Sequence, residues 1–124
     1  MTGWTAEELR AIGAADELDI AAMRPDGKLR PYVTIWVVRV GDDLYVRSYR
    51  GRAGAWFRAA LRRPEGRVRA AEIERGVNFE PAADDQQDAI DHAYRGKYAR
   101  YSASYVDPMV APAARAATLR LIVR

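Results

Sequence analysis

The chain has 124 residues, 49% hydrophobic and 30% charged, which is the composition of a globular rather than a disordered protein. This length suits a single domain, residues 1–124, because it can bury one core but not two. No run approaches the roughly 18 apolar residues of a membrane span, and the N-terminal residues lack the apolar segment of a secretion signal. The absence of cysteine excludes disulfides, thiolate nucleophiles and cysteine zinc sites. We therefore expect a cytoplasmic protein.

The net charge of +3 is distributed unevenly along the chain. Residues 47–69 contain eight arginines and one acid, Glu65, so this stretch carries +7 and the remainder of the chain carries −4. All basic residues except Lys28 and Lys97 are arginines, so a general preference for arginine explains most of them. Positive charge that is confined to one segment indicates a local anion site.

The first third of the chain predicts a short helix and two strands. Thr5 and Glu8 have the spacing of a capping box, which predicts a helix that begins there. Residues 17–23 are compatible with a strand, and Arg-Pro-Asp-Gly at 24–27 has the order of a tight turn. The nearly continuous apolar run YVTIWVVRV, residues 32–40, predicts a strand buried on both faces.

A further strand over residues 44–49 is predicted from its alternating pattern. Because side chains alternate along a strand, Arg47 and Ser48 are expected to point to opposite faces. Trp56 then opens a short helix, which Pro64 and Gly66 end.

The remainder of the chain predicts one hairpin, one long helix and a last strand. RVRAAEI and VNFE flank a turn at residues 74–76, and residues 84–101 have apolar positions at helical spacing. Residues 102–117 are rich in Pro and Ala without a clear period, and residues 118–123 predict the last strand. The expected fold is α+β, a small antiparallel barrel of about six strands with two or three helices.

Metal and serine-triad chemistry are disfavoured by the sequence. The lone histidine, His92, lies inside the predicted long helix with no cysteine or second histidine to join it. The acids Asp84, Asp85, Asp88 and Asp91 crowd the first turns of that helix, where capping and solvation explain them. We therefore expect no metal site and assign no catalytic residue.

The segment YVRSYRGRAGAW, residues 45–56, is the strongest candidate for a site. Glycines let backbone N–H groups approach an anion, a helix N-terminus adds partial positive charge, and guanidinium groups bind phosphate oxygens in pairs. A polar hairpin exit with exposed arginines has a similar sequence, and that alternative stays open. On the first interpretation the ligand is a phosphate or a carboxylate.

The stretches VTIWVVRVGDDLYVRS, GRAGAWFRAALRRP and GRVRAAEIERGVNFEP resemble the flavin-binding split barrels, which include pyridoxamine phosphate oxidases and deazaflavin-dependent nitroreductases. In those families a strand ends in a small polar residue and a Gly/Arg/Lys loop takes the cofactor phosphate. Ser48, Arg50, Arg52 and Trp56 occupy those places here. Residues 27–30, Gly-Lys-Leu-Arg, are similar to the second half of the nitroreductases' Gly-Lys-Arg loop.

The whole chain, including IAAMRPDGKLRP, KYARY and YVDPMV, resembles an uncharacterised bacterial domain-of-unknown-function family thought to share that fold. Two features depart from the nitroreductases: the first half of their loop is missing, and Ala59-Ala60 stands where an Asn-Leu pair is typical.

The resemblance implies a homodimeric split barrel that binds FMN or a deazaflavin coenzyme. It implies an oxidoreductase that transfers hydride to a small oxidised substrate of unknown identity. The residues expected at the cofactor, with Trp56 packed beside it and Lys28 and Arg30 reaching the phosphate or a tail, are Arg47, Ser48, Arg50, Arg52, Trp56, Lys28 and Arg30. The tyrosines considered for a substrate pocket are Tyr32, Tyr49, Tyr98, Tyr101 and Tyr105.

Two alternatives stay open. One is a barrel without enzymatic activity that binds RNA or single-stranded DNA on its arginines, with Tyr45, Tyr49 and Trp56 as stacking platforms. Because the positive charge is confined to one segment, nucleic acid is the weaker expectation, and no membrane partner is expected. The other alternative is a dimeric split-barrel scaffold that has lost its cofactor.

Overall fold

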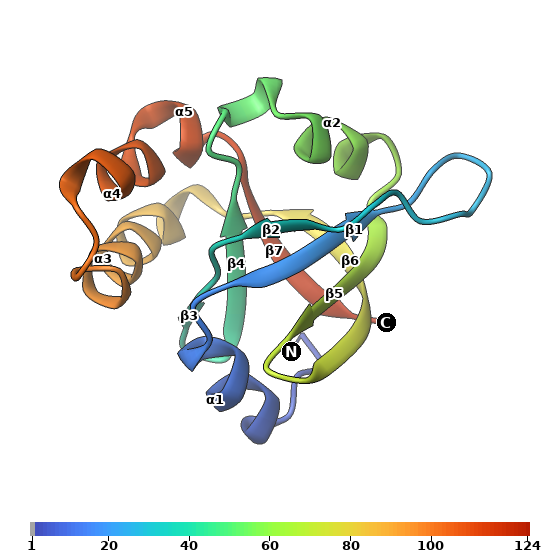
Figure 1. Ribbon diagram of the computed structural model, residues 1–124, viewed down its shortest axis with the longest axis horizontal. Helices are drawn as coiled ribbons and strands as arrows, with labels where there is room; N and C mark the ends of the chain where they lie inside the picture. The colour runs from blue at the N-terminus through green and yellow to red at the C-terminus, as the bar shows by residue number, and fades with distance from the viewer. Residues whose placement is uncertain (1) are drawn as a thin grey trace.

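The computed structural model describes residues 2–124, which form one seven-stranded antiparallel sheet and five α-helices (Figure 1). The strands are β1 (Leu18–Ala22), β2 (Val33–Ile35), β3 (Val38–Val40), β4 (Asp43–Arg47), β5 (Glu65–Ala70), β6 (Ile73–Pro81) and β7 (Thr118–Val123). The helices are α1 (Ala6–Ala14), α2 (Ala55–Arg62), α3 (Gln87–Lys97), α4 (Ala103–Val110) and α5 (Pro112–Arg115). Two 3₁₀ turns, η1 (Gly51–Ala53) and η2 (Asp84–Gln86), precede α2 and α3.

The sheet curls into a split barrel because its two edge strands are neighbours in the chain. The strand order is β2-β1-β5-β6-β7-β4-β3, yet only Trp36 and Val37 separate β2 from β3. The two edges must therefore approach each other, and Figure 1 shows the curled sheet that results. The predicted small antiparallel split barrel is confirmed, with seven strands rather than six and five helices rather than two or three.

Two apolar clusters lie on the two faces of the sheet. The barrel interior contains Leu44 and Val46 of β4 together with inward side chains of the other strands, of α1 and of α2. The outer cluster packs α3 and α4 against β3 and β4 and consists of Val38, Tyr45, Ile90, Tyr94, Tyr98, Val106 and Met109. Both faces of β4 are therefore buried, with the alternation that the sequence predicts.

The prediction of one doubly buried strand over residues 32–40 is wrong. The run forms two three-residue strands, of which β2 pairs with β1 and β3 pairs with β4. Val33 is 41% exposed, because β2 is an edge strand. The chain leaves one edge of the curled sheet at Ile35 and enters the other edge at Val38, so a continuous ladder is impossible.

The hairpin between β5 and β6 turns at Ala71 and Glu72 rather than at residues 74–76. Both turn residues have positive φ, 51° and 66°, a conformation that non-glycine residues rarely adopt. The sequence has neither glycine nor asparagine there, so the usual turn signal is missing. Gly76 instead pairs with Arg67 inside the ladder.

The helical region after β6 also differs from the prediction. The expected helix over residues 84–101 is shorter, because α3 ends at Lys97, and residues 102–117 contain α4 and α5. Pro108 lies inside α4 and Pro112 is the first residue of α5. Because proline usually interrupts a helix, the sequence of this region did not predict the two short helices. None of the helices in residues 2–124 has the length and apolarity needed to cross a membrane.

The corner between β2 and β3 is held by two side chains from the end of α3. Lys97 Nζ donates a hydrogen bond to the Val37 carbonyl oxygen at 2.6 Å. The Tyr98 hydroxyl accepts from the Val37 amide at 3.1 Å and donates to the Asp16 carbonyl oxygen at 2.7 Å. Burial lowers the pKa of Lys97 from 10.5 to about 8.

We predict that the stability of the parent protein rises relative to that of Lys97→Met as pH increases from 8 to 10.5. Over this range the folded lysine has lost its proton while the unfolded one keeps it, so the cost of a half-buried charge disappears. Denaturant unfolding of both proteins at several pH values measures the difference. A difference that stays constant over this range would contradict the lowered pKa.

Candidate functional site

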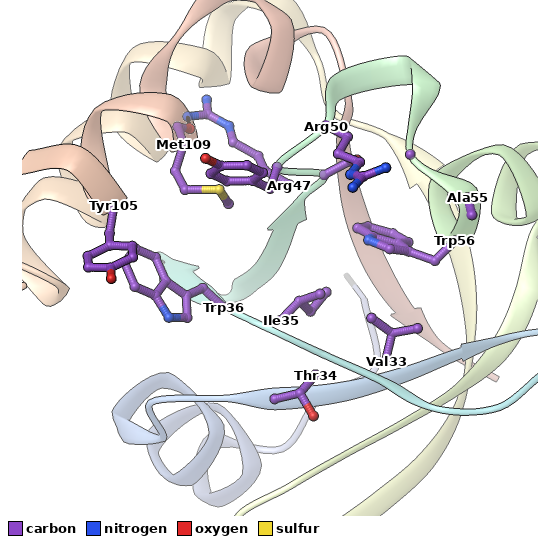
Figure 2. A pocket seen from close by; sticks show the side chains of 13 residues that line it. Val33, Thr34, Ile35, Trp36, Arg47, Arg50, Ala55, Trp56, Tyr105 and Met109 are labelled. Atoms are coloured by element: carbon purple, nitrogen blue, oxygen red, sulfur yellow. Dashed lines mark hydrogen bonds between the residues drawn. The ribbon is translucent and has the colours of Figure 1, made fainter.

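A cavity of about 530 Å³ opens between β2, the end of β4, the start of α2 and α4 (Figure 2). Its volume lies in the range of small-molecule sites. The cavity is lined by residues 33–36, 47–50 and 54–56 together with Tyr105 and Met109. Three parts of the chain that are distant in sequence, residues 33–36, 47–56 and 105–109, therefore meet around it.

The polar end of the cavity is formed by Ser48 and the N-terminus of α2. Ser48 is 1% exposed, and a Cβ on Gly54 would lie 2.3 Å from its Oγ. Only glycine therefore lets α2 begin against this hydroxyl. The first hydrogen bond of α2 runs from the Arg58 amide to the Gly54 carbonyl oxygen, which leaves the preceding amides without a partner inside the helix. A hydroxyl beside unpaired amides is an arrangement that binds anions.

Arg50 adds a positive charge at this end. Its side chain is exposed, and within residues 2–124 it forms no ion pair. Figure 2 shows it beside Trp56, at the start of α2. The guanidinium is therefore free to meet an anion held by Ser48 and the helix.

The opposite end of the cavity is apolar and aromatic. Trp36, Tyr105 and Met109 lie together there, away from Arg50 and Trp56 (Figure 2). The Trp36 ring stacks on Tyr98 with centroids 3.9 Å apart and planes 3° apart, which fixes its orientation. A ligand with an anionic group at one end and a flat apolar group at the other matches this arrangement.

Arg47 is the most enclosed charge of the site, with 1% of its surface exposed. Its Nε donates to Thr118 Oγ1 at 3.0 Å, and Nη1 donates to an Asp91 carboxylate oxygen at 2.6 Å and to the Met109 carbonyl oxygen at 2.8 Å. Nη2 donates to the Gln87 carbonyl oxygen at 3.3 Å and to its Oε1 at 2.8 Å. All five donors of the guanidinium therefore have internal acceptors. Arg47 positions the cavity wall and has no donor left for a ligand.

The three other basic residues expected at the cofactor do not line the cavity. Arg52 Nη1 donates to the Ala116 carbonyl oxygen at 3.4 Å, and its guanidinium lies 5.7 Å from the Phe57 ring centroid. Lys28 and Arg30 belong to the connection between β1 and β2. The structure thus brings Ser48, Arg50 and Trp56 together at the cavity.

Of the tyrosines considered for a substrate pocket, Tyr49 and Tyr105 line the cavity. Tyr98 is fully buried behind Trp36, and the Tyr32 hydroxyl instead donates to Glu74 at 3.1 Å. Tyr101 is 37% exposed and lies outside the lining.

Tyr45 is 2% exposed, so its prediction as a stacking platform for nucleic acid is wrong. His92 is exposed on α3 and does not line the cavity. Within residues 2–124 no three His, Asp or Glu side chains are arranged to hold a metal ion.

Trp36 and Met109 line the cavity but were not predicted from the sequence. Trp36 stands in the middle of the apolar run that was interpreted as one buried strand, so its position at a corner was hidden. Met109 follows Pro108 in a segment with no recognisable period. The YVDPMV stretch contributed Tyr105 as a pocket candidate and otherwise entered only through the family resemblance.

We predict that Arg47→Met destabilises the fold by about 3 to 5 kcal/mol, because it removes the donors of four buried hydrogen bonds and one of the two arginines that oppose the Asp91 charge. Arg95→Met is the matched control. Arg95 pairs with Asp107 at 3.4 Å on the surface, where an ion pair contributes below about 1 kcal/mol. Denaturant unfolding measures both. Equal losses in the two variants would show that the Arg47 contacts are dispensable.

The fold is shared by proteins of known structure, of which three are compared with this chain. An F₄₂₀ reductase superposes with a TM-score of 0.61 and 17% identity over 93% of this chain and 90% of its own. A putative pyridoxamine 5′-phosphate oxidase from Listeria innocua superposes with a TM-score of 0.61 and 10% identity over 95% of this chain and 90% of its own. A haem storage protein from Vibrio cholerae superposes with a TM-score of 0.64 and 10% identity over 96% of this chain and 89% of its own. The chain therefore has the split-barrel fold, which it shares with these three proteins.

Within that class the chain belongs to the family described as "Uncharacterized protein conserved in bacteria (DUF2255)", whose model matches residues 8–121. This agrees with the resemblance noted in the sequence. No curated protein matches the chain.

Proposed function

We propose that this chain binds a flavin nucleotide, FMN or a deazaflavin, in the cavity between β2, β4, α2 and α4. The observation that carries the proposal is the polar end, where Gly54 lets the Ser48 hydroxyl and the first amides of α2 lie together. Arg50 supplies an unpaired positive charge beside them. The aromatic end at Trp36 suits the flat ring of the same ligand.

The bound cofactor supplies the chemistry of hydride transfer, which makes the proposed activity that of an oxidoreductase. Ser48, the α2 amides and Arg50 bind the phosphate and so orient the ring. Trp36 and Met109 contact the ring and exclude water from one end of the cavity. None of the described cavity-lining residues is Asp, Glu or His, and the hydroxyl groups there belong to Thr34, Ser48, Tyr49 and Tyr105. This composition suits reduction of a small oxidised substrate.

Haem is the second candidate, because two lining side chains can ligate iron. These are Tyr105 and Met109, both at the aromatic end (Figure 2). Absorption spectra after addition of FMN, deazaflavin or haem separate the candidates. An iron-ligand band that disappears in Tyr105→Phe or Met109→Leu would favour haem, whereas a shifted flavin band that survives both changes favours the flavin.

We predict that Arg50→Ala weakens FMN binding roughly ten- to a hundredfold, because a hydrogen bond to a charged group contributes about 1.5 to 3 kcal/mol. Arg52→Ala is the matched control: it removes a neighbouring exposed arginine that does not line the cavity. Riboflavin, which lacks the phosphate, is expected to bind the parent weakly and to be indifferent to Arg50→Ala. Fluorescence titration of the parent and the two variants with FMN and with riboflavin measures the affinities.

Two results would contradict this assignment. Equal weakening by Arg50→Ala and Arg52→Ala would mean that the arginines act through general charge rather than at the cavity. Equal affinity of the parent for FMN and riboflavin would mean that no phosphate is held there.

The proposed function includes a homodimer in which a second copy covers the mouth of the cavity. Three of the five exposed large hydrophobic residues, Val33, Tyr49 and Tyr105, line it, and the two tyrosines are each 62% exposed. Apolar surface gathered at one place on a protein marks an interaction site. A monomer would leave this surface in water.

We predict a dimer at micromolar concentration and a shift toward monomer in Val33→Glu, because a charge on the exposed β2 edge opposes its burial. Leu61→Glu is the control, since Leu61 on α2 is 40% exposed, like Val33 at 41%, but lies outside the cavity. Light scattering coupled to size exclusion measures the mass. A monomeric parent, or equal behaviour of the two variants, would contradict the shared cavity.

A further inference from the structure

Unpaired arginines gather on one part of the protein. Eleven of the eighteen arginines form ion pairs with carboxylates. Within residues 2–124 the remaining seven form no ion pair. Six of these seven lie on the β1–β2 connection, on η1 and its flanks, and on α2. They are Arg24, Arg30, Arg50, Arg52, Arg58 and Arg62, with Arg10 on α1 the exception. Arginine-rich composition alone does not explain this segregation.

The outer side of α2 is basic and carries an exposed leucine. Arg58 and Arg62 are exposed and lie one turn apart, and Leu61 between them is 40% exposed. The helix contains no acidic residue, while its inner side buries Phe57 in the barrel core. Like charges four residues apart destabilise a helix, so this arrangement is unfavourable unless an anion opposes it.

The connection between β1 and β2 extends the same surface. It projects from the barrel beside α2 (Figure 1), with Arg24 and Lys28 exposed. Arg63 Nη1 donates to the Arg24 and Pro25 carbonyl oxygens at 3.1 and 2.9 Å, which holds this connection against the end of α2. We call Arg24, Lys28, Arg58, Arg62 and Leu61 the basic surface.

We propose that the basic surface docks the protein on an anionic phospholipid membrane. Basic side chains grouped on an amphipathic helix with an exposed apolar residue are typical of membrane-surface binding. Binding of this kind needs only surface contact and no membrane-spanning helix. This contact differs from the expectation of no membrane partner, which rested on the lack of a span.

The shape of the basic surface favours a membrane over a nucleic acid. Proteins that bind single strands use a positively charged groove with aromatic platforms. Neither of the two described cavities is lined by a residue of the basic surface, and none of its members is aromatic. A projecting loop beside a helix suits a flat bilayer.

Cosedimentation with vesicles tests the proposal. The parent protein is expected to pellet with phosphatidylcholine vesicles that contain phosphatidylglycerol and not with phosphatidylcholine alone. Replacing Arg58 and Arg62 together by Gln is expected to weaken binding about thirtyfold, since each basic residue near an anionic surface contributes about fivefold. Leu61→Gln is expected to weaken binding with no change in charge.

The matched control replaces Arg10 and Arg95 by Gln, which removes the same charge from exposed positions on α1 and α3. Binding close to that of the parent supports the proposal. An equal loss of vesicle binding in the two double variants overturns it. Parent binding that does not depend on phosphatidylglycerol also overturns it. Binding of a short RNA that depends on Arg58 and Arg62, without vesicle binding, also overturns it. Thermal unfolding of each variant confirms that the fold is intact.

Discussion

The buried guanidinium of Arg47 joins the barrel to the helices outside it. A charge enclosed in protein is tolerated only when its donors are matched by acceptors and its charge is opposed. Gln87 and Asp91 of α3, the Met109 carbonyl of α4 and Thr118 of β7 supply these acceptors. Arg115 of α5 contacts the same Asp91 carboxylate, so all three C-terminal helices depend on this network.

The C-terminal end of β4 positions the residues at both ends of the cavity. Arg47 points outward to α4, which carries Tyr105 and Met109, whereas Ser48 follows it and meets Gly54 at the start of α2. Gly51, with φ of +65°, turns the chain between them, and a Cβ there would lie 3.0 Å from the Ala113 carbonyl oxygen. The aromatic wall and the anion-binding helix start are therefore positioned from one place, the end of β4. The resulting cavity has the chemistry of a site for a flat ligand with an anionic group.

Signals that depend on a few neighbouring residues were predictable from the sequence. The capping box at Thr5 and Glu8 is formed as expected, and the alternation of β4 correctly places Leu44 and Val46 on the face opposite to Tyr45. The glycines and Ser48 of the 45–56 segment also indicated where a helix N-terminus would meet a polar strand end.

Features that depend on distant partners were not predictable. The sequence offers Arg47 as one of several arginines, but its acceptor Asp91 is 44 residues away, so nothing local distinguishes a buried arginine from an exposed one. The position of Trp36 was not predictable for a similar reason, because a continuous apolar run does not show where the chain leaves one edge of the sheet and enters the other. Ala71 and Glu72 adopt a turn that their residue types disfavour, and only the register of β5 with β6 requires it.

A crystal structure of the protein with FMN would show whether the phosphate lies at the start of α2. We expect the phosphate within hydrogen-bonding distance, about 3 Å, of Ser48 Oγ and the first amides of α2, with the ring toward Trp36. The Arg47 contacts are expected to be unchanged. FMN bound elsewhere, or a phosphate that displaces Asp91 from Arg47, would contradict the proposed site.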